Sequence, residues 1–185
     1  MNRIFVLAIP ALLLLSSCDE IFAKRIRGNG NITMQSRSAG SFNSIDVSGN
    51  IDVYAGQDSS SSVKVETDEN LQEYIDIYNE GEILRIRPKE GYNLKSDRKI
   101  KVYVSAADYK EFQASGACDI VGEGRIASSS DIHFELSGSC DVTMELQAPK
   151  ISSNLSGACS IKLKGETKDF SVDGSGSTDI FCFPF

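Results

Sequence analysis

The chain has 185 residues, of which 24% are charged, and its formal net charge is −7. This length fits one domain with a sizeable core. An acidic chain without clusters of Lys and Arg argues against a nucleic-acid partner and against electrostatic docking on anionic lipid.

The first 17 residues predict a lipoprotein signal peptide. Arg3 supplies the positive start, Ile4–Leu15 is apolar, and Leu15-Ser16-Ser17-Cys18 resembles a bacterial lipobox. Cleavage before Cys18 would make it the lipidated residue, whereas an ordinary signal peptide with an incidental cysteine is the alternative. We expect residues 18–27 to be a lipidated tether.

This N-terminus predicts the location of the protein. The lipid on Cys18 would attach it to a membrane of the bacterial cell envelope, and we expect the outer membrane. No other stretch approaches the length of about 18 apolar residues that a membrane span needs. The sequence leaves open whether the domain lies on the periplasmic face or on the cell surface.

The rest, residues 28–185, is predicted to be a single domain rich in strands. Apolar residues alternate around Ser48-Gly49, and a degenerate copy of this pattern is expected to begin at Gly30. The next Ser-Gly turn comes 67 residues after Gly49, and the interval predicts a β layer that flanks the later repeats. Its expected elements are strands at Ser62–Glu66, Tyr74–Tyr78, Ile83–Arg87 and Lys99–Val104, a short helix at Glu69–Tyr74, and an exposed hairpin loop at Lys89–Lys101.

The last third repeats a Ser-Gly turn followed by an alternating apolar strand. The glycines are Gly116, Gly138, Gly157 and Gly176, spaced 22, 19 and 19 residues apart. A period near 20 residues suits one coil of a β-solenoid, in which each coil covers the apolar face of the previous one. The predicted fold is therefore all-β, a right-handed single-stranded β-helix or β-solenoid with an N-terminal β layer.

Alternation predicts which side chains face inward. Two residues after each glycine come Cys118, Cys140, Cys159 and Thr178, in the same phase as neighbouring apolar residues. We expect these four to form a buried structural ladder of reduced thiols and one hydroxyl. Disulfides are the alternative, but stacked parallel side chains fit disulfide geometry poorly. No Cys-x-x-Cys is present and the one histidine, His133, is in the outward phase, so we expect no metal and no cofactor.

The outward phase supplies the weak candidates for ligand binding. They are Asp119, Asp141 and Asp179 in one column, Glu135 in another, and Tyr92 in the expected hairpin loop. The aspartates resemble calcium ligands of some repeat proteins, yet Ser160 interrupts the column, which favours a solvated face. Tyr92 could stack on a sugar ring. The carboxylates are spread along columns rather than gathered in a cleft, so no catalytic residue is predicted.

Together these motifs resemble the family described as putative auto-transporter adhesin, head GIN domain, found in exported lipoproteins of Bacteroidetes. The resemblance is carried by Phe42-x-x-Ile45-x-Val47-Ser48-Gly49, Gly81-x-Ile83-Leu84-x-Ile86 and the Ser-Gly repeats, and it covers the chain from about Gly30 to its end. It implies a right-handed β-helix on an exported lipoprotein, and it supplies no catalytic residues. Fold by itself does not give function.

Three functions are compatible with these motifs. The first is a non-enzymatic adhesion or glycan-binding module, because a repeated polar surface suits multivalent contact with an extended polymer. The second is a structural or assembly lipoprotein with a protein partner in the envelope. The third, least favoured, is a polysaccharide-degrading enzyme.

Overall fold

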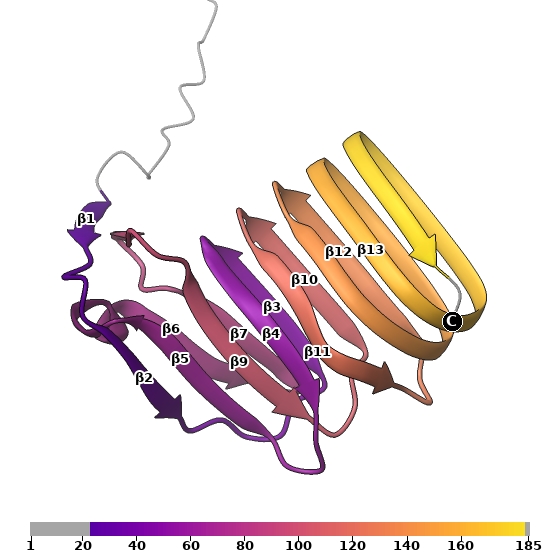
Figure 1. Cartoon of the computed structure of the whole chain (residues 1–185), viewed down its shortest axis with the longest axis horizontal. Helices are drawn as coiled ribbons and strands as arrows, with labels where there is room; N and C mark the ends of the chain where they lie inside the picture. The colour runs from indigo at the N-terminus through magenta and orange to yellow at the C-terminus, as the bar shows by residue number, and fades with distance from the viewer. Residues whose placement is uncertain (1–22, 184–185) are drawn as a thin grey trace, which may run out of the picture.

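The computed structural model describes residues 23–183, so Cys18 and most of the expected tether lie outside the described residues. The all-β prediction is confirmed (Figure 1). Among the described residues one short 3-10 helix, η2 (Glu69–Tyr74), occupies the expected helix position. The strands are β1 (Lys24–Arg27), β2 (Ile32–Arg37), β3 (Ser44–Gly49), β4 (Ile51–Gln57), β5 (Ser62–Asp68), β6 (Ile75–Glu80), β7 (Ile83–Pro88), β8 (Tyr92–Lys95), β9 (Ile100–Ala106), β10 (Glu111–Gly116), β11 (Asp119–Ala127), β12 (Ile132–Gly138) and β13 (Asp141–Phe183).

Parallel pairing joins strands from distant parts of the chain. β3 pairs with β10, β10 with β12, and β12 with residues 151–157 of β13, all in parallel. On the other half, β4 pairs with β11 and β11 with residues 141–147 of β13, again in parallel. Figure 1 shows successive turns of the chain, which we call coils, lying side by side toward the C-terminus. Because β13 takes part in both halves, they form one eleven-stranded sheet.

The long interval before the repeats extends both halves of this sheet. β7 pairs in parallel with β3, and β6 then adds in the antiparallel direction. On the other half β9 pairs in parallel with β4, and β5 and β2 follow in antiparallel order. These strands lie at the N-terminal end of the stack, as expected for the flanking β layer (Figure 1).

The Ser-Gly corners form a column of close backbone contacts. Gly49, Gly116, Gly138, Gly157 and Gly176 all have positive φ, between 95° and 104°. A Cβ added at Gly138 would lie 2.5 Å from the carbonyl oxygen of Gly116, and Gly157 and Gly176 are as tightly placed. Only glycine tolerates both the conformation and this approach, which explains why the corners repeat it.

The core lies between the two halves of the sheet. Alternate residues of each coil are buried, as the period-two pattern predicts. Phe112 and Phe134 are fully buried and stack with ring centroids 5.3 Å apart, and Tyr109 stacks on Phe112 at 5.1 Å. Register is fixed by this burial, because a shift by one residue would turn these rings to solvent.

Three local expectations are wrong. The segment after Gly30 is no parallel coil, since β2 pairs antiparallel with β5 and Met34 is 55% exposed. Residues 24–27 of the expected tether form β1, which pairs with β8 inside the expected hairpin loop. The last coil is more open than the earlier ones: Thr178, which was expected to be buried with the cysteines, is half-buried, and Ile180 and Cys182 in the same phase are exposed.

Candidate functional site

The outward side chains of three neighbouring coils form two polar rows, which we call the outward ladder. Parallel register places Glu111 beside His133 and His133 beside Ser152, and in the second row Gln113 beside Glu135 and Glu135 beside Asn154. These residues come from β10, β12 and β13. Their positions alternate with the buried ones, so the same pairing that builds the core places them together on the surface.

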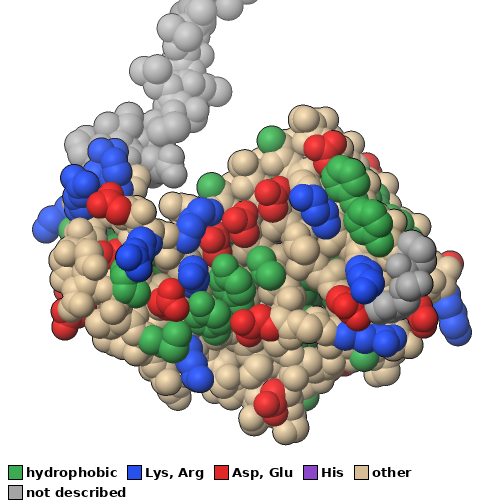
Figure 2. Space-filling model, in the orientation of Figure 1, with side chains coloured by type: hydrophobic (Ala, Val, Ile, Leu, Met, Phe, Trp, Pro, Cys, Tyr) green, Lys and Arg blue, Asp and Glu red, His purple; other side chains and the backbone are tan. Residues whose placement is uncertain are grey.

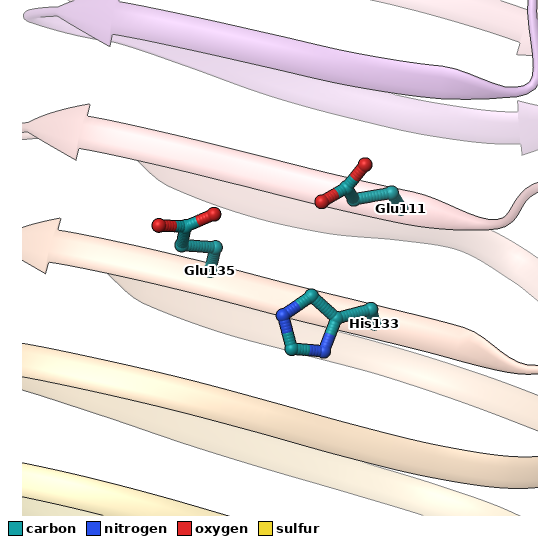
Figure 3. A group of neighbouring side chains, drawn as sticks. All are labelled: Glu111, His133 and Glu135. Atoms are coloured by element: carbon teal, nitrogen blue, oxygen red, sulfur yellow. The ribbon is translucent and has the colours of Figure 1, made fainter.

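The centre of the outward ladder is a cluster of Glu111, His133 and Glu135 (Figure 3). One ligand atom of each side chain lies within 4.8 Å of the others. Glu111 and His133 are half-buried, whereas Glu135 is exposed. Adjacent polar residues restrain the group: Nδ1 of His133 is 2.9 Å from Oγ of Ser152, and Nε2 of Gln113 donates to Oε1 of Glu111 at 2.9 Å.

An ion-pair network borders this ladder at its N-terminal end. Asp46 is in register with Gln113 on one side and with Arg85 on the other. Arg85 forms ion pairs with Asp46 and with Glu80, the latter at 2.7 Å. The polar surface therefore continues beyond the ladder onto β3 and β7.

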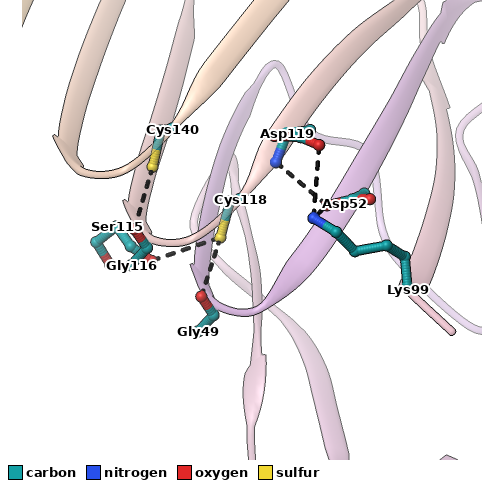
Figure 4. Close-up of polar contacts among 8 residues, drawn as sticks. All are labelled: Gly49, Asp52, Lys99, Ser115, Gly116, Cys118, Asp119 and Cys140. Atoms are coloured by element: carbon teal, nitrogen blue, oxygen red, sulfur yellow. Dashed lines mark hydrogen bonds and ion pairs between the residues drawn. The ribbon is translucent and has the colours of Figure 1, made fainter. Parts of the chain in front are cut away.

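The aspartates of the predicted column lie in different surroundings. Asp119 lies 3.5 Å from Nζ of Lys99, which also pairs with Asp52 at 3.1 Å (Figure 4). Asp52, three residues after Gly49, has the same outward phase, but its side chain is only 6% exposed, and it accepts a hydrogen bond from the backbone N–H of Asp119 at 3.3 Å. Asp119 is thus part of a structural ion pair.

The charge on Lys99 is favoured by this arrangement. Burial alone would lower the pKa of Lys99, but the hydrogen bond and charge of Asp52, together with the charge of Asp119, raise it. Sequence reasoning missed this pair because Lys99 comes from the long interval between Gly49 and Gly116, where no repeat gives the register.

The other two aspartates and Glu135 stay apart. Asp141 and Asp179 are exposed, and Ser160 stands between them in the column. Asp141 lies on the half of the sheet that pairs with β11, whereas Glu135 lies on β12. The structure gathers Glu135 with Glu111 and His133 instead. The signal for this grouping was present, since Glu111 and His133 both stand five residues before their corner glycines.

The cysteines of the ladder lie next to the Ser-Gly corners, as Figure 4 shows for Cys118 and Cys140. Cys118, Cys140 and Cys159 are buried free thiols, and each contacts a carbonyl oxygen of its own corner: Cys118 contacts Ser115 at 3.5 Å and Cys140 contacts Ser137 at 3.3 Å. The neighbouring thiol of Cys140, together with burial, raises the pKa of the Cys118 thiol. Thr178, the fourth member, is half-buried because it belongs to the more open last coil.

Tyr92 lies on β8 and is half-buried. Its ring centroid is 4.8 Å from that of Tyr74, at an angle of 49°. With Leu94, Pro88 and the Gly49 corner it lines a hollow of about 860 Å³. The ring is therefore packed against a neighbour and is less free to stack on a sugar than a loop residue would be.

The surface charge of the molecule is mixed. In the view of Figure 2, Lys and Arg side chains are interspersed with Asp and Glu. Hydrophobic side chains also reach the surface over the last coil, where the exposed apolar residues are Phe170, Ile180, Phe181 and Phe183.

The sequence of this chain matches a known protein family over most of its length. Residues 41–182 match the model of the family "Putative auto-transporter adhesin, head GIN domain". The chain belongs to this family. The match begins just before β3 and includes the outward ladder and the cysteine ladder. Membership in this head GIN family indicates an adhesion-type role at the cell envelope or surface.

Solved structures show the same fold. A putative adhesin from Bacteroides fragilis is similar with a TM-score of 0.58 and 14% identity, over 85% of this chain and 99% of that chain. A putative adhesin from Parabacteroides merdae gives a TM-score of 0.52 and 17% identity, over 85% and 99%. At such identities the likeness concerns the fold alone. No curated protein matches this chain. Among residues 23–183, no helix is long and apolar enough to cross a membrane.

Proposed function

We propose that this protein is a non-enzymatic adhesion module of the bacterial cell envelope, which binds glycans through the outward ladder. The observation that carries the proposal is the alignment of acidic, amide, hydroxyl and imidazole side chains in register on neighbouring coils. Membership in the family described as "Putative auto-transporter adhesin, head GIN domain" supports the role, and the polar rows supply the surface.

The spacing of the coils suits an extended polymer. Neighbouring parallel strands are about 4.8 Å apart, so a chain lying across them meets a polar group at each coil. Carboxylates accept hydrogen bonds from sugar hydroxyls, and amides such as those of Gln113 and Asn154 both donate and accept. Each contact is weak, but several contacts along one polymer raise the overall affinity.

The proposed architecture of the domain is the β-solenoid expected from the sequence. The parallel register of β3, β10, β12 and β13 supports a right-handed single-stranded β-solenoid. A lipid on Cys18 would attach the domain to the outer membrane, and β1, which begins at Lys24, leaves only a short segment between the lipid and the first strand. The lipobox is what supports this attachment.

Retention on immobilised polysaccharides tests the adhesion role. The full-length chain, extracted in detergent, is passed over an acidic, a neutral and an amino-sugar polysaccharide. We expect retention on at least one, and its loss when Glu135 and Asn154 are both replaced by Ala. Glu123→Ala is the matched control, because Glu123 is exposed on β11, on the other half of the sheet.

Either of two results would contradict the proposal. One is the absence of retention on all three polymers, and the other is equal retention of the double variant and the wild type. The release of new reducing ends would favour an enzyme instead. The lipid anchor is tested separately: labelled fatty acid should be incorporated into the wild type and not into Cys18→Ala.

A further inference from the structure

The cluster at the centre of the outward ladder has the donor set of a metal site. We propose that Glu111, His133 and Glu135 bind a divalent transition-metal ion, of which zinc is the representative. An imidazole nitrogen and two carboxylate oxygens are donors that Zn²⁺ binds readily. Their ligand atoms already lie within 4.8 Å of one another, on two strands held in register. This inference stands independently of the adhesion role.

A hydrogen bond orients the imidazole of His133 so that its other nitrogen can bind a metal ion. Nδ1 of His133 is 2.9 Å from Oγ of Ser152, a neighbour on the next coil. When Nδ1 is protonated and donates a hydrogen bond to Oγ of Ser152, the lone pair of Nε2 is available to a metal ion. Metal-binding histidines almost always hold their second nitrogen in such a hydrogen bond. The amide nitrogen of Asn154 lies 3.4 Å from Nε2, a long contact that a metal ion would replace.

One of the two carboxylates is held by a hydrogen bond, and neither has an ion-pair partner among the described residues. Gln113 holds one oxygen of Glu111, which leaves the other oxygen to bind. Neither Glu111 nor Glu135 forms an ion pair with another residue in 23–183. Two neighbouring carboxylates repel each other, and a divalent cation between them removes that repulsion. Figure 3 shows both on the same side of the strands as the imidazole.

The three ligand atoms need to move only slightly closer together to bind a zinc ion. A tetrahedral zinc ion with bonds of about 2.0–2.1 Å needs its ligand atoms about 3.3 Å apart. Glu135 is exposed and can rotate to supply the difference. Three protein donors leave one tetrahedral position for water or a ligand. Calcium, which takes six to eight oxygen ligands, fits this set less well.

Titration calorimetry with zinc chloride tests the site. The full-length chain is purified in detergent without a histidine tag and stripped with a chelator, in a Cys182→Ser background because the Cys182 thiol is exposed. We expect one zinc ion per chain with an affinity that falls at least tenfold in His133→Asn, and by about tenfold in Ser152→Ala, whose hydroxyl positions the imidazole. Glu123→Gln, the matched control, should bind like the wild type.

A second measurement avoids substitutions in the site. His133 is the only histidine of the chain, so modification by diethyl pyrocarbonate can be followed on a single peptide by mass spectrometry. Zinc should protect His133, and calcium at the same concentration should not. Unchanged zinc affinity in His133→Asn, or equal modification of His133 with and without zinc, would overturn the proposal.

Discussion

The two faces of the same coils follow different rules. Inward positions of β10, β12 and β13 hold Ala114, Leu136 and Leu155 in one column, all apolar and buried. Outward positions on the same strands hold unlike residues, for example Glu111, His133 and Ser152. Packing against the next coil restricts the inward column to a few residue types, whereas solvent leaves the outward column free. A binding function therefore has to be sought on the outward face.

The largest expected loss of stability comes from removing a buried side chain of the inward face. Phe134→Ala should destabilise the fold by about 4 kcal/mol, because it removes a fully buried ring stacked on Phe112 and leaves a cavity. Glu135→Ala, one position along on the outward face, should change stability by less than about 0.5 kcal/mol. Urea unfolding of both variants measures the contrast, and similar midpoints would remove the distinction between the faces.

The corner glycines, where the chain passes from one half of the sheet to the other, come next. Gly138→Ala should cost about 3 kcal/mol, since an alanine there has both an unfavourable φ and a Cβ 2.5 Å from a carbonyl oxygen. Gly124→Ala shares the positive φ but meets no atom within 4 Å, so it should cost about 1 kcal/mol. Thermal unfolding compares the two; equal losses would mean that the close stacking of corners contributes nothing.

The buried carboxylate of Asp52 is an exception on the outward face. Lys99→Gln should destabilise the fold by about 1 kcal/mol, because Asp52 loses its charged partner. Since the pKa of Lys99 is raised in the folded state, this contribution is complete below the ordinary value of 10.5 and is lost as the pH rises through the folded-state pKa.

Unfolding of the wild type and Lys99→Gln at neutral and alkaline pH checks the sign. The difference between the two proteins should shrink at alkaline pH. A difference that grows with pH would show that the ammonium of Lys99 is not the stabilising group.

A polar residue on the inward face gives the smallest effect. Ser153 is 1% exposed, and among the described residues its hydroxyl has no hydrogen-bond partner. Ser153→Ala should therefore stabilise the fold by about 0.5 kcal/mol, because it removes an unsatisfied buried group. Ser152→Ala, on the outward face, should be close to neutral. Differential scanning calorimetry can resolve the pair, and a destabilised Ser153→Ala would indicate a partner for the hydroxyl.

Sequence periodicity predicted side-chain burial and turn conformation where these depend only on a single strand and its repeated copies. The phase of Cys118, Cys140 and Cys159 gave their burial, and the Ser-Gly corners gave the positive φ. It could not predict contacts that depend on chain segments without a repeat, so the pairing of Lys99 with Asp52 and the strand at Tyr92 were missed. Burial of Thr178 was expected from its phase, but it is only half-buried, because burial also depends on packing between residues distant in the sequence.

Alkylation of the native protein by iodoacetamide tests the division into two faces most directly. Peptide mass spectrometry distinguishes the cysteines of the ladder from Cys182, which is exposed. The structure predicts rapid labelling of Cys182, while Cys118, Cys140 and Cys159 stay unlabelled until urea unfolds the chain. Labelling of the three ladder cysteines at the rate of Cys182 would contradict the register and, with it, the assignment of the outward ladder to binding.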